Sequence, residues 1–162
     1  MRPEQKIKKI ETALAKLAEH EVSCRLCPRE CGVNRGRGEK GFCQSGNKAS
    51  VSHALLHYGE EPVLSGLRDC AERGAGRMRP HSGSGTIFFA GCNLKCSFCQ
   101  NYQLSWLGQG NTVSNEELAR MMLGLQVKGA LNINFVSPSH LILPILRALR
   151  IAYAQGLRLP VV

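Results

Sequence analysis

The stretch Thr86-Ile87-Phe88-Phe89-Ala90-Gly91-Cys92-Asn93-Leu94-Lys95-Cys96-Ser97-Phe98-Cys99 decides how this chain folds. Its first five residues form a continuous apolar run, which is typical of a strand buried on both faces in a parallel sheet. Three cysteines with the spacing CxxxCxxC follow directly. We therefore expect a loop at the end of a buried strand that carries three thiols.

Downstream of this loop, helices and strands are predicted to alternate. Ser114-Asn115-Glu116-Glu117 is a capping box that starts a helix, and Gly129 ends it. Residues 131–136 alternate as a second strand, a second helix runs from about 141 or 143 to 155, and residues 159–162 begin a third strand. The order strand, helix, strand, helix, strand predicts an α/β fold with right-handed parallel crossovers.

Upstream of the loop the pattern changes. Residues 4–19 have the apolar spacing of an amphipathic helix, and residues 24–43 are rich in cysteine and glycine, as if metal ligation replaced a core. Residues 51–64 contain a short predicted strand, whereas 65–85 are polar and rich in glycine and arginine. We predict an N-terminal helix and cysteine-rich module over 1–64, a linker over 65–85 and an α/β domain over 86–162.

Composition excludes some classes of protein. The net charge is +9, but the basic residues are spread along the chain without a long run, so nucleic-acid binding is a minority interpretation. The N-terminus lacks the apolar region of a signal peptide, and Pro144, Arg147 and Arg150 interrupt the most apolar stretch, 141–154. We expect a cytoplasmic chain that does not enter a membrane. Its eight cysteines then indicate metal or redox chemistry more than disulfides.

The loop cysteines Cys92, Cys96 and Cys99 are predicted to be metal ligands. Three thiolates can hold a [4Fe-4S] cluster and leave one iron open, and an open position distinguishes a catalytic metal site from a closed structural one. Two alternatives stay open, a zinc site with three thiolate ligands and a set of buried thiols. The preceding strand, the glycine before Cys92 and the aromatic residue before Cys99 favour the cluster.

The residues 91–101, 129–140 and 24–32 together resemble radical S-adenosylmethionine (SAM) enzymes, most closely the group similar to pyruvate formate-lyase activating enzyme. The resemblance implies a partial parallel β/α barrel with the cluster on the loop after its first strand. It also implies SAM as a second cofactor, cleaved reductively to a 5′-deoxyadenosyl radical that abstracts hydrogen. The implied partners are an electron donor such as flavodoxin or ferredoxin and a protein substrate, a glycyl radical enzyme; a small-molecule substrate is the alternative.

The same resemblance suggests residues that bind SAM. It places Phe98 against the adenine. Enzymes of this group usually have Gly-Gly-Glu after their second strand, whereas this chain has Ser137-Pro138-Ser139-His140. Polar contacts with SAM are expected from this stretch and from two asparagines that would line the barrel lumen: Ser137, Ser139, His140, Asn132 and Asn134. The alternatives are that Ser139 only caps the next helix and that the asparagines form the wet face of a strand.

The length of the chain departs from the family. The chain ends in its third predicted barrel strand, whereas the family continues through several more. Half a barrel leaves an open sheet edge, which proteins normally avoid. We therefore expect a truncated product, a split gene or a shortened chain, whose activity alone is in doubt.

Four further cysteines, Cys24, Cys27, Cys31 and Cys43, are candidates for a second metal site. Four thiolates would close a site, as in structural zinc or an accessory electron-transfer cluster, and His53 or His57 could replace one ligand. Free thiols are the alternative, and Cys70 is interpreted as a bystander. Two other functions also compete with the radical enzyme. One is a zinc-bearing, basic nucleic-acid-binding module, and the other is an inactive remnant that binds a cluster but not SAM.

Overall fold

The computed structural model describes residues 2–65 and 83–162 and contains an open, four-stranded mixed sheet. The strands are β1 (Ala49–His57), β2 (Ser84–Phe89), β3 (Asn111–Val113) and β4 (Ile133–Val136), in the order β3-β1-β2-β4. β2 and β4 are parallel, whereas β1 runs antiparallel to both β2 and β3. The predicted α/β class is confirmed.

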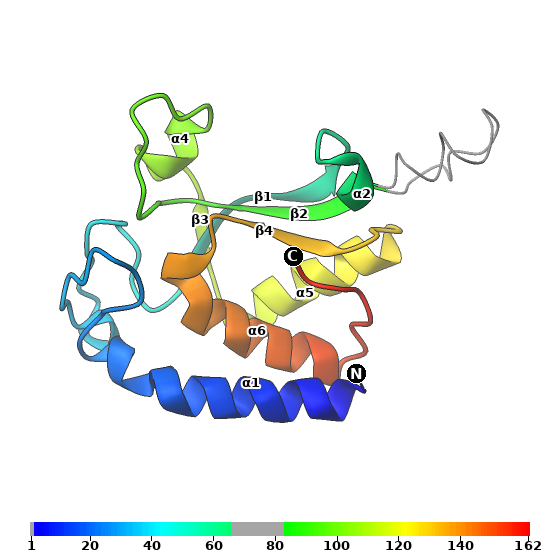
Figure 1. Cartoon of the computed structure of the whole chain (residues 1–162), viewed down its shortest axis with the longest axis horizontal. Helices are drawn as coiled ribbons and strands as arrows, with labels where there is room; N and C mark the ends of the chain where they lie inside the picture. Colours follow the sequence, from blue (N-terminus) through cyan, green and yellow to red (C-terminus); the bar gives the residue numbers. More distant parts are fainter. Residues whose placement is uncertain (1, 66–82) are drawn as a thin grey trace.

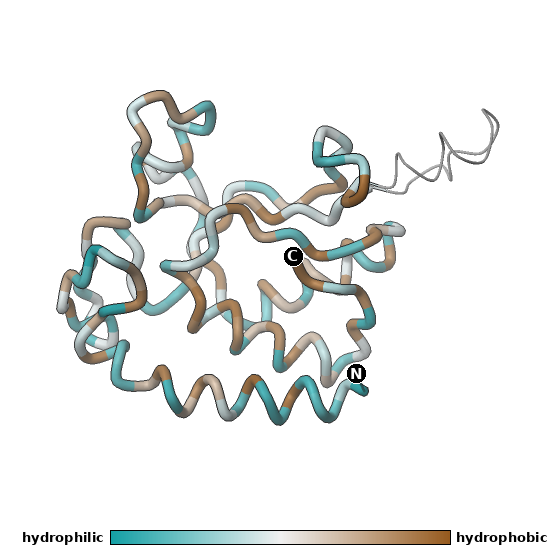
Figure 2. Tube along the Cα trace, in the orientation of Figure 1, coloured by the Kyte–Doolittle hydropathy of each residue, from teal (hydrophilic) through white to brown (hydrophobic). Residues whose placement is uncertain are grey.

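Three long helices lie on one side of the sheet (Figure 1). They are α1 (Pro3–Leu17), α5 (Asn115–Val127) and α6 (Ile142–Ala154); α2 (Pro62–Ser65) and α4 (Tyr102–Ser105) are single turns. α5 and α6 cover the sheet, and α1 packs on α6 as an outer layer (Figure 1). Along α1, hydrophilic and hydrophobic residues alternate (Figure 2), which agrees with the amphipathic helix predicted there.

Alternation along the strands divides their side chains between two faces. Ile87 and Phe89 of β2 and Ile133 and Phe135 of β4 belong to the core that α5 and α6 complete. The capping box of α5 forms as predicted, because Ser114 Oγ accepts the Glu117 N–H at 3.1 Å and a Glu117 carboxylate oxygen accepts the Ser114 N–H at 2.7 Å. This local signal explains why the start of α5 could be predicted from sequence.

The predicted parallel crossover is confirmed for β2 and β4, whereas β1 enters the sheet antiparallel to both of its neighbours. β1 is nine residues long and pairs with β2 from Val51 opposite Phe89 to His57 opposite Ser84. It belongs to the stretch that we assigned to the N-terminal module, so that stretch supplies a strand to the sheet. β3 was not predicted.

Two predicted boundaries can be compared with the structure. Ser84 and Gly85, placed in the linker, belong to β2. Residues 66–82, including Cys70 and His81, lie outside the described residues. At the other end, residues 160–162 pair in parallel with β4, through Ile133 N–H to Pro160 O at 2.9 Å and Val162 N–H to Ile133 O at 2.8 Å. This is the start of the predicted third parallel strand.

None of the helices in the described ranges is both long enough and apolar enough to cross a membrane.

Candidate metal centre

Three loops that carry the predicted site residues meet at one edge of the sheet. Because β2 and β4 are parallel, with Phe88 opposite Val136, their carboxyl ends lie at the same edge. The loop with Cys92, Cys96 and Cys99 leaves β2 there, and residues 137–141 leave β4 there. The cysteine-rich N-terminal segment, residues 24–43, lies at this same end of the molecule (Figure 1). Carboxyl ends of parallel strands are common ligand sites.

Gly91 fixes the path of the chain from β2 into the cysteine loop. Its φ is +81°, a conformation that L side chains rarely adopt, and its N–H donates to Leu104 O at 2.8 Å. A Cβ at this position would collide with the carbonyl oxygen of Cys43. The glycine before the first cysteine is therefore needed both for the turn and for close contact with the N-terminal segment.

Two of the three loop thiols accept hydrogen bonds. Cys92 is buried and its Sγ accepts the Leu94 N–H at 3.4 Å, whereas the Cys99 Sγ accepts the Ser105 hydroxyl at 3.2 Å. Cys96 is exposed. Donors to ligand sulfur orient the ligand and tune the metal. Ser105 was missed in the sequence, since a serine after the motif has no distinctive spacing.

The thiols are not gathered into a finished site. Over residues 2–65 and 83–162, no three His, Cys, Asp or Glu side chains lie close enough to hold a metal ion, and the seven described cysteines are free. The donor set nevertheless fits an iron–sulfur cluster in its chemistry, because three thiols lie on one short loop and two of them have donors to sulfur. Metal binding commonly completes the ordering of its own ligands.

The residues predicted to bind SAM differ in exposure. Phe98 is 88% exposed at the cysteine loop, and Ser137 and Ser139 are exposed beyond β4. His140, in contrast, is fully buried. The structure therefore leaves Phe98 and the two serines free to contact a ligand at the shared edge, while the His140 ring lies beneath the surface. Their contacts with SAM stay predictions.

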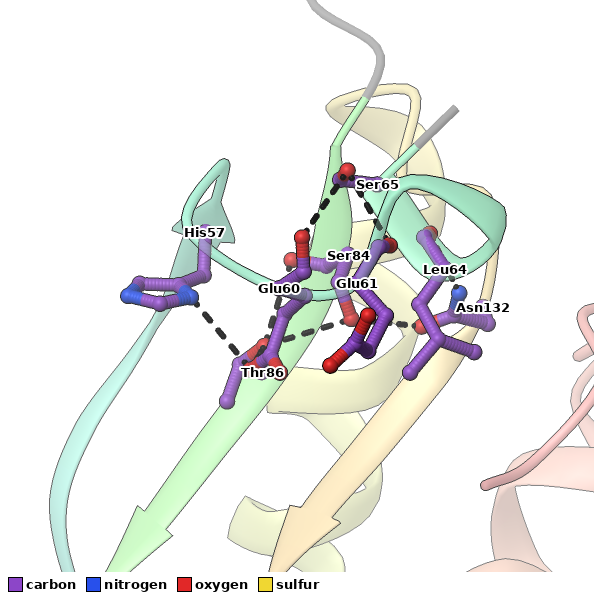
Figure 3. A network of polar contacts seen from close by, with 8 residues as sticks. All are labelled: His57, Glu60, Glu61, Leu64, Ser65, Ser84, Thr86 and Asn132. Carbon is purple, nitrogen blue, oxygen red and sulfur yellow. Dashed lines mark hydrogen bonds and ion pairs between the residues drawn. The ribbon is translucent and has the colours of Figure 1, made fainter. Parts of the chain in front are cut away.

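Asn132 belongs to a polar network at the opposite end of the strands (Figure 3). Its side chain accepts the Ser84 hydroxyl at 2.7 Å and donates to Leu64 O at 2.8 Å. In the same network, Glu60 accepts the Thr86 hydroxyl at 3.2 Å and lies 3.3 Å from His57 Nδ1. These bonds hold the segment around α2 on the sheet and give Asn132 a structural role; its cofactor contact stays a prediction.

The other asparagine and the two candidate histidine ligands lie on the sheet. Asn134 is buried in β4 opposite Thr86 of β2. His53 contacts Ser52 Oγ through Nδ1 at 2.8 Å. His57 lies at the end of β1 farthest from the shared edge, because β1 is antiparallel to β2. The structure thus places His57 with Glu60 and away from the N-terminal cysteines.

The N-terminal segment has little regular structure, as predicted, with one short 3-10 turn at Arg35–Arg37 between Cys31 and Cys43. Cys24 and Cys43 are buried, Cys27 is half-buried and Cys31 is exposed. The Cys31 Sγ accepts the Phe42 N–H at 3.5 Å, and a Cβ on Gly41 would lie 2.9 Å from that sulfur. The segments around Cys31 and Cys43 are therefore folded against each other.

This segment also contacts the cysteine loop. Arg29 Nε donates to Asn93 O at 3.2 Å, and Arg29 lies over the Phe42 ring at 3.9 Å. Lys95 Nζ approaches the same ring at 5.1 Å, so Phe42 lies between two cations. The sequence reasoning missed these contacts; the aromatic residue between Gly41 and Cys43 was the available signal.

Arg35 is the least expected residue of this region. Its side chain is 3% exposed, Nη1 donates to His140 O at 2.6 Å and Nη2 donates to Cys43 Sγ at 3.3 Å. Burial and the nearby guanidinium lower the pKa of His140 to about 4, so its ring is neutral at pH 7. Nothing in the sequence distinguished Arg35 from the other arginines.

Comparison with known proteins adds relatives without a described activity. No family model and no solved structure matches the chain significantly. An uncharacterized protein of Methanocaldococcus jannaschii is 34% identical over 136 residues, covering 78% of this chain and 34% of the relative. A second uncharacterized protein of that organism is 32% identical over 91 residues, covering 56% of this chain and 26% of the relative. The chain thus spans about a third or less of the curated relatives it matches.

Proposed function

We propose that the chain is part of a radical SAM enzyme that binds a [4Fe-4S] cluster through Cys92, Cys96 and Cys99. One observation carries the proposal: all three cysteines lie on the loop that leaves the parallel strand β2, at the edge that also receives the loop after β4. A ligand at that edge is within reach of both loops. When bound, the cluster and SAM supply a 5′-deoxyadenosyl radical for hydrogen abstraction.

The residues of the chain would hold and orient these cofactors. Leu94 N–H and the Ser105 hydroxyl would donate to the ligand sulfurs of Cys92 and Cys99, as they already do. Phe98 would lie against the adenine, and the exposed Ser137 and Ser139 would offer polar contacts to SAM. Their exposure supports these roles, since each is available to a ligand.

We further propose that the sheet is the start of a partial parallel β/α barrel. The succession β2, α5, β4, α6 and the paired residues 160–162 repeats one strand–helix unit, with both helices on the same side of the sheet. The opposite face would line the barrel. Because the chain spans about a third or less of the two relatives from Methanocaldococcus jannaschii, the activity proposed is that of the longer protein.

An acidic electron carrier, such as flavodoxin or ferredoxin, is the proposed reductant. The exposed basic residues Arg25, Arg29 and Lys40 lie on the N-terminal segment at the edge of the cysteine loop. A cavity of about 340 Å³ beside Gly91 has Lys40 and Lys48 in its lining, and none of its described lining residues is acidic. We propose a glycyl radical enzyme as the protein substrate and the reducing cytoplasm as the location, in keeping with the free cysteines.

The test is electron paramagnetic resonance on anaerobically reconstituted, reduced protein with and without SAM. A four-iron signal that changes on adding SAM is expected. A cluster signal indifferent to SAM would favour an inactive remnant. Absence of a cluster, with bound zinc and salt-dependent nucleic-acid binding, would favour the zinc-bearing module instead.

A further inference from the structure

Arg35 is a buried cation without an acidic partner among the described residues. Its side chain is 3% exposed, and its described hydrogen-bond acceptors are a backbone carbonyl and a sulfur, while Nε has none within residues 2–65 and 83–162. Removing a charge from water costs several kcal/mol, so a buried cation needs compensating partners. A partner anion is therefore expected beside Arg35.

The two groups that Arg35 contacts belong to different parts of the candidate site. Cys43 lies in the N-terminal segment, and His140 lies 105 residues beyond Arg35, in the connection from β4 to α6. The planar guanidinium can donate to both acceptors at once, in a fixed geometry that a lysine ammonium cannot reproduce. Arg35 thus ties the N-terminal cysteines to the segment that carries Ser137 and Ser139.

The four N-terminal cysteines supply the missing anion if they bind a metal. Four thiolates around one zinc ion carry a net charge of about −2, which would offset the charge of Arg35. The sulfurs of Cys31 and Cys43 already accept N–H donors, from Phe42 and Arg35. The absence of a side chain at Gly41 leaves the Cys31 sulfur its space. Two of the four sulfurs thus have donors of the kind found beside thiolate ligands, and because no three described thiols lie close enough to hold a metal ion, binding must draw the cysteines together.

We propose that Cys24, Cys27, Cys31 and Cys43 form a structural metal centre, and that Arg35 is a positioning residue that couples this centre to the 137–141 connection. Metal binding fixes Cys43, Cys43 fixes the guanidinium, and the guanidinium holds the carbonyl of His140. The connection is thereby held in the arrangement that presents Ser137 and Ser139. That the serines meet SAM rests on the proposed function; the coupling itself does not.

Hydrogen exchange read by mass spectrometry tests the coupling in the full chain carrying Cys96→Ala, which lacks the loop cluster. The readout is the peptide covering residues 137–142, where Leu141 N–H donates to Pro138 O at 2.8 Å. Adding Zn²⁺ to metal-free protein is expected to slow exchange there about tenfold, because fixing the guanidinium through Cys43 stabilises the charge-assisted hydrogen bond that His140 O accepts from it. Arg35→Gln should abolish this slowing.

Arg37→Gln is the matched control, because Arg37 lies in the same short turn but is exposed, and its variant should keep the Zn²⁺ response. Arg35→Lys keeps the charge but cannot make both hydrogen bonds, so it should also lose the Zn²⁺ response. If Arg35→Gln does not fold, Arg35→Lys tests the coupling in its place. The proposal is overturned if the parent chain does not bind Zn²⁺, if its exchange is indifferent to Zn²⁺, or if both Arg35 variants respond normally. If the cluster signal of the wild-type protein does not change on adding SAM, the proposed function is refuted but the coupling through Arg35 is not.

Discussion

The two cysteine-bearing regions of this chain are held in place by different means. The loop with Cys92, Cys96 and Cys99 directly follows β2, whose Ile87 and Phe89 are anchored in the core. The segment from Cys24 to Cys43 has a single 3-10 turn and is held by scattered polar contacts from Arg29, Arg35 and Phe42. The first region takes its position from the sheet, and the second takes its position from its neighbours.

This difference suggests that a metal has a different task in each region. At the loop, the sheet fixes the point from which the cysteines leave before any metal binds, as the proposed catalytic site would require. In the N-terminal segment, the metal would supply cohesion that a core supplies elsewhere.

The largest effect is expected from Cys96→Ala. Loss of one of three ligands should abolish the SAM-responsive cluster while leaving the N-terminal metal bound, because the two sites share no ligand. Electron paramagnetic resonance with and without SAM, together with metal analysis, measures both. Cys27→Ala is the matched control. It should lose the N-terminal metal and keep the SAM-responsive cluster. An unchanged SAM-sensitive signal in Cys96→Ala would refute the ligand assignment.

Gly91→Ala should lower the free energy of unfolding by about 4 kcal/mol, because a positive φ and a collision with the Cys43 carbonyl act together. Urea denaturation measures the change. Gly124→Ala, in α5, where the new Cβ would meet no described atom within 4 Å beyond its own helix backbone and adjacent residues, should instead stabilise by up to about 1 kcal/mol. Equal effects of the two substitutions would show that Gly91 is not tightly packed against the carbonyl of Cys43.

Lowering the pH should lower the free energy of unfolding through protonation of His140. In the unfolded chain this histidine takes up a proton below pH 6.5, whereas in the folded protein it does so only near pH 4. Stability should therefore fall from pH 6.5 to pH 4 by up to roughly 3 kcal/mol. Urea titrations of metal-free wild type and His140→Gln, compared at each pH, isolate this contribution from the carboxyl groups. Parallel curves would mean that His140 does not titrate with a lowered pKa.

The smallest effect concerns the direct contact between the regions. Phe42 and Lys95 should couple by about 0.5–1 kcal/mol, as expected for a cation near an aromatic face at an exposed site. A double-mutant cycle with Phe42→Leu and Lys95→Met measures the coupling in unfolding free energy. A coupling of zero would leave Arg29 and Arg35 as the contacts that join the two regions.

Sequence patterns located those parts of the fold that have local causes. The helices α5 and α6 and the strand β2 were predicted because capping residues, apolar spacing and a buried apolar run are properties of neighbouring residues. The antiparallel pairing of β1 was not predicted. Its partner is chosen by side chains far along the chain, and a short alternating stretch does not encode the direction of its neighbour.

The same distinction divides the candidate site. Cysteine spacing and the glycine before Cys92 identified the loop, because three candidate ligands within eight residues must lie on the same loop. Ser105, Arg29 and Phe42 were not predicted as site residues, because their contacts with the cysteine loop depend on how the chain folds. His140 was noticed as polar and expected to meet SAM, but its complete burial depends on the packing of the connection that carries it.

Sequence alone predicted the candidate metal ligands and the approximate extents of α5 and α6, because spacing and capping act over a few residues. The fold in three dimensions is what brings Cys43 and Arg29 against the loop after β2 and buries one arginine between Cys43 and His140. These contacts join residues that are far apart along the chain, so neighbouring residues do not encode them. A buried cation is tolerated where folding brings acceptors to it, and one of these acceptors lies 105 residues from Arg35.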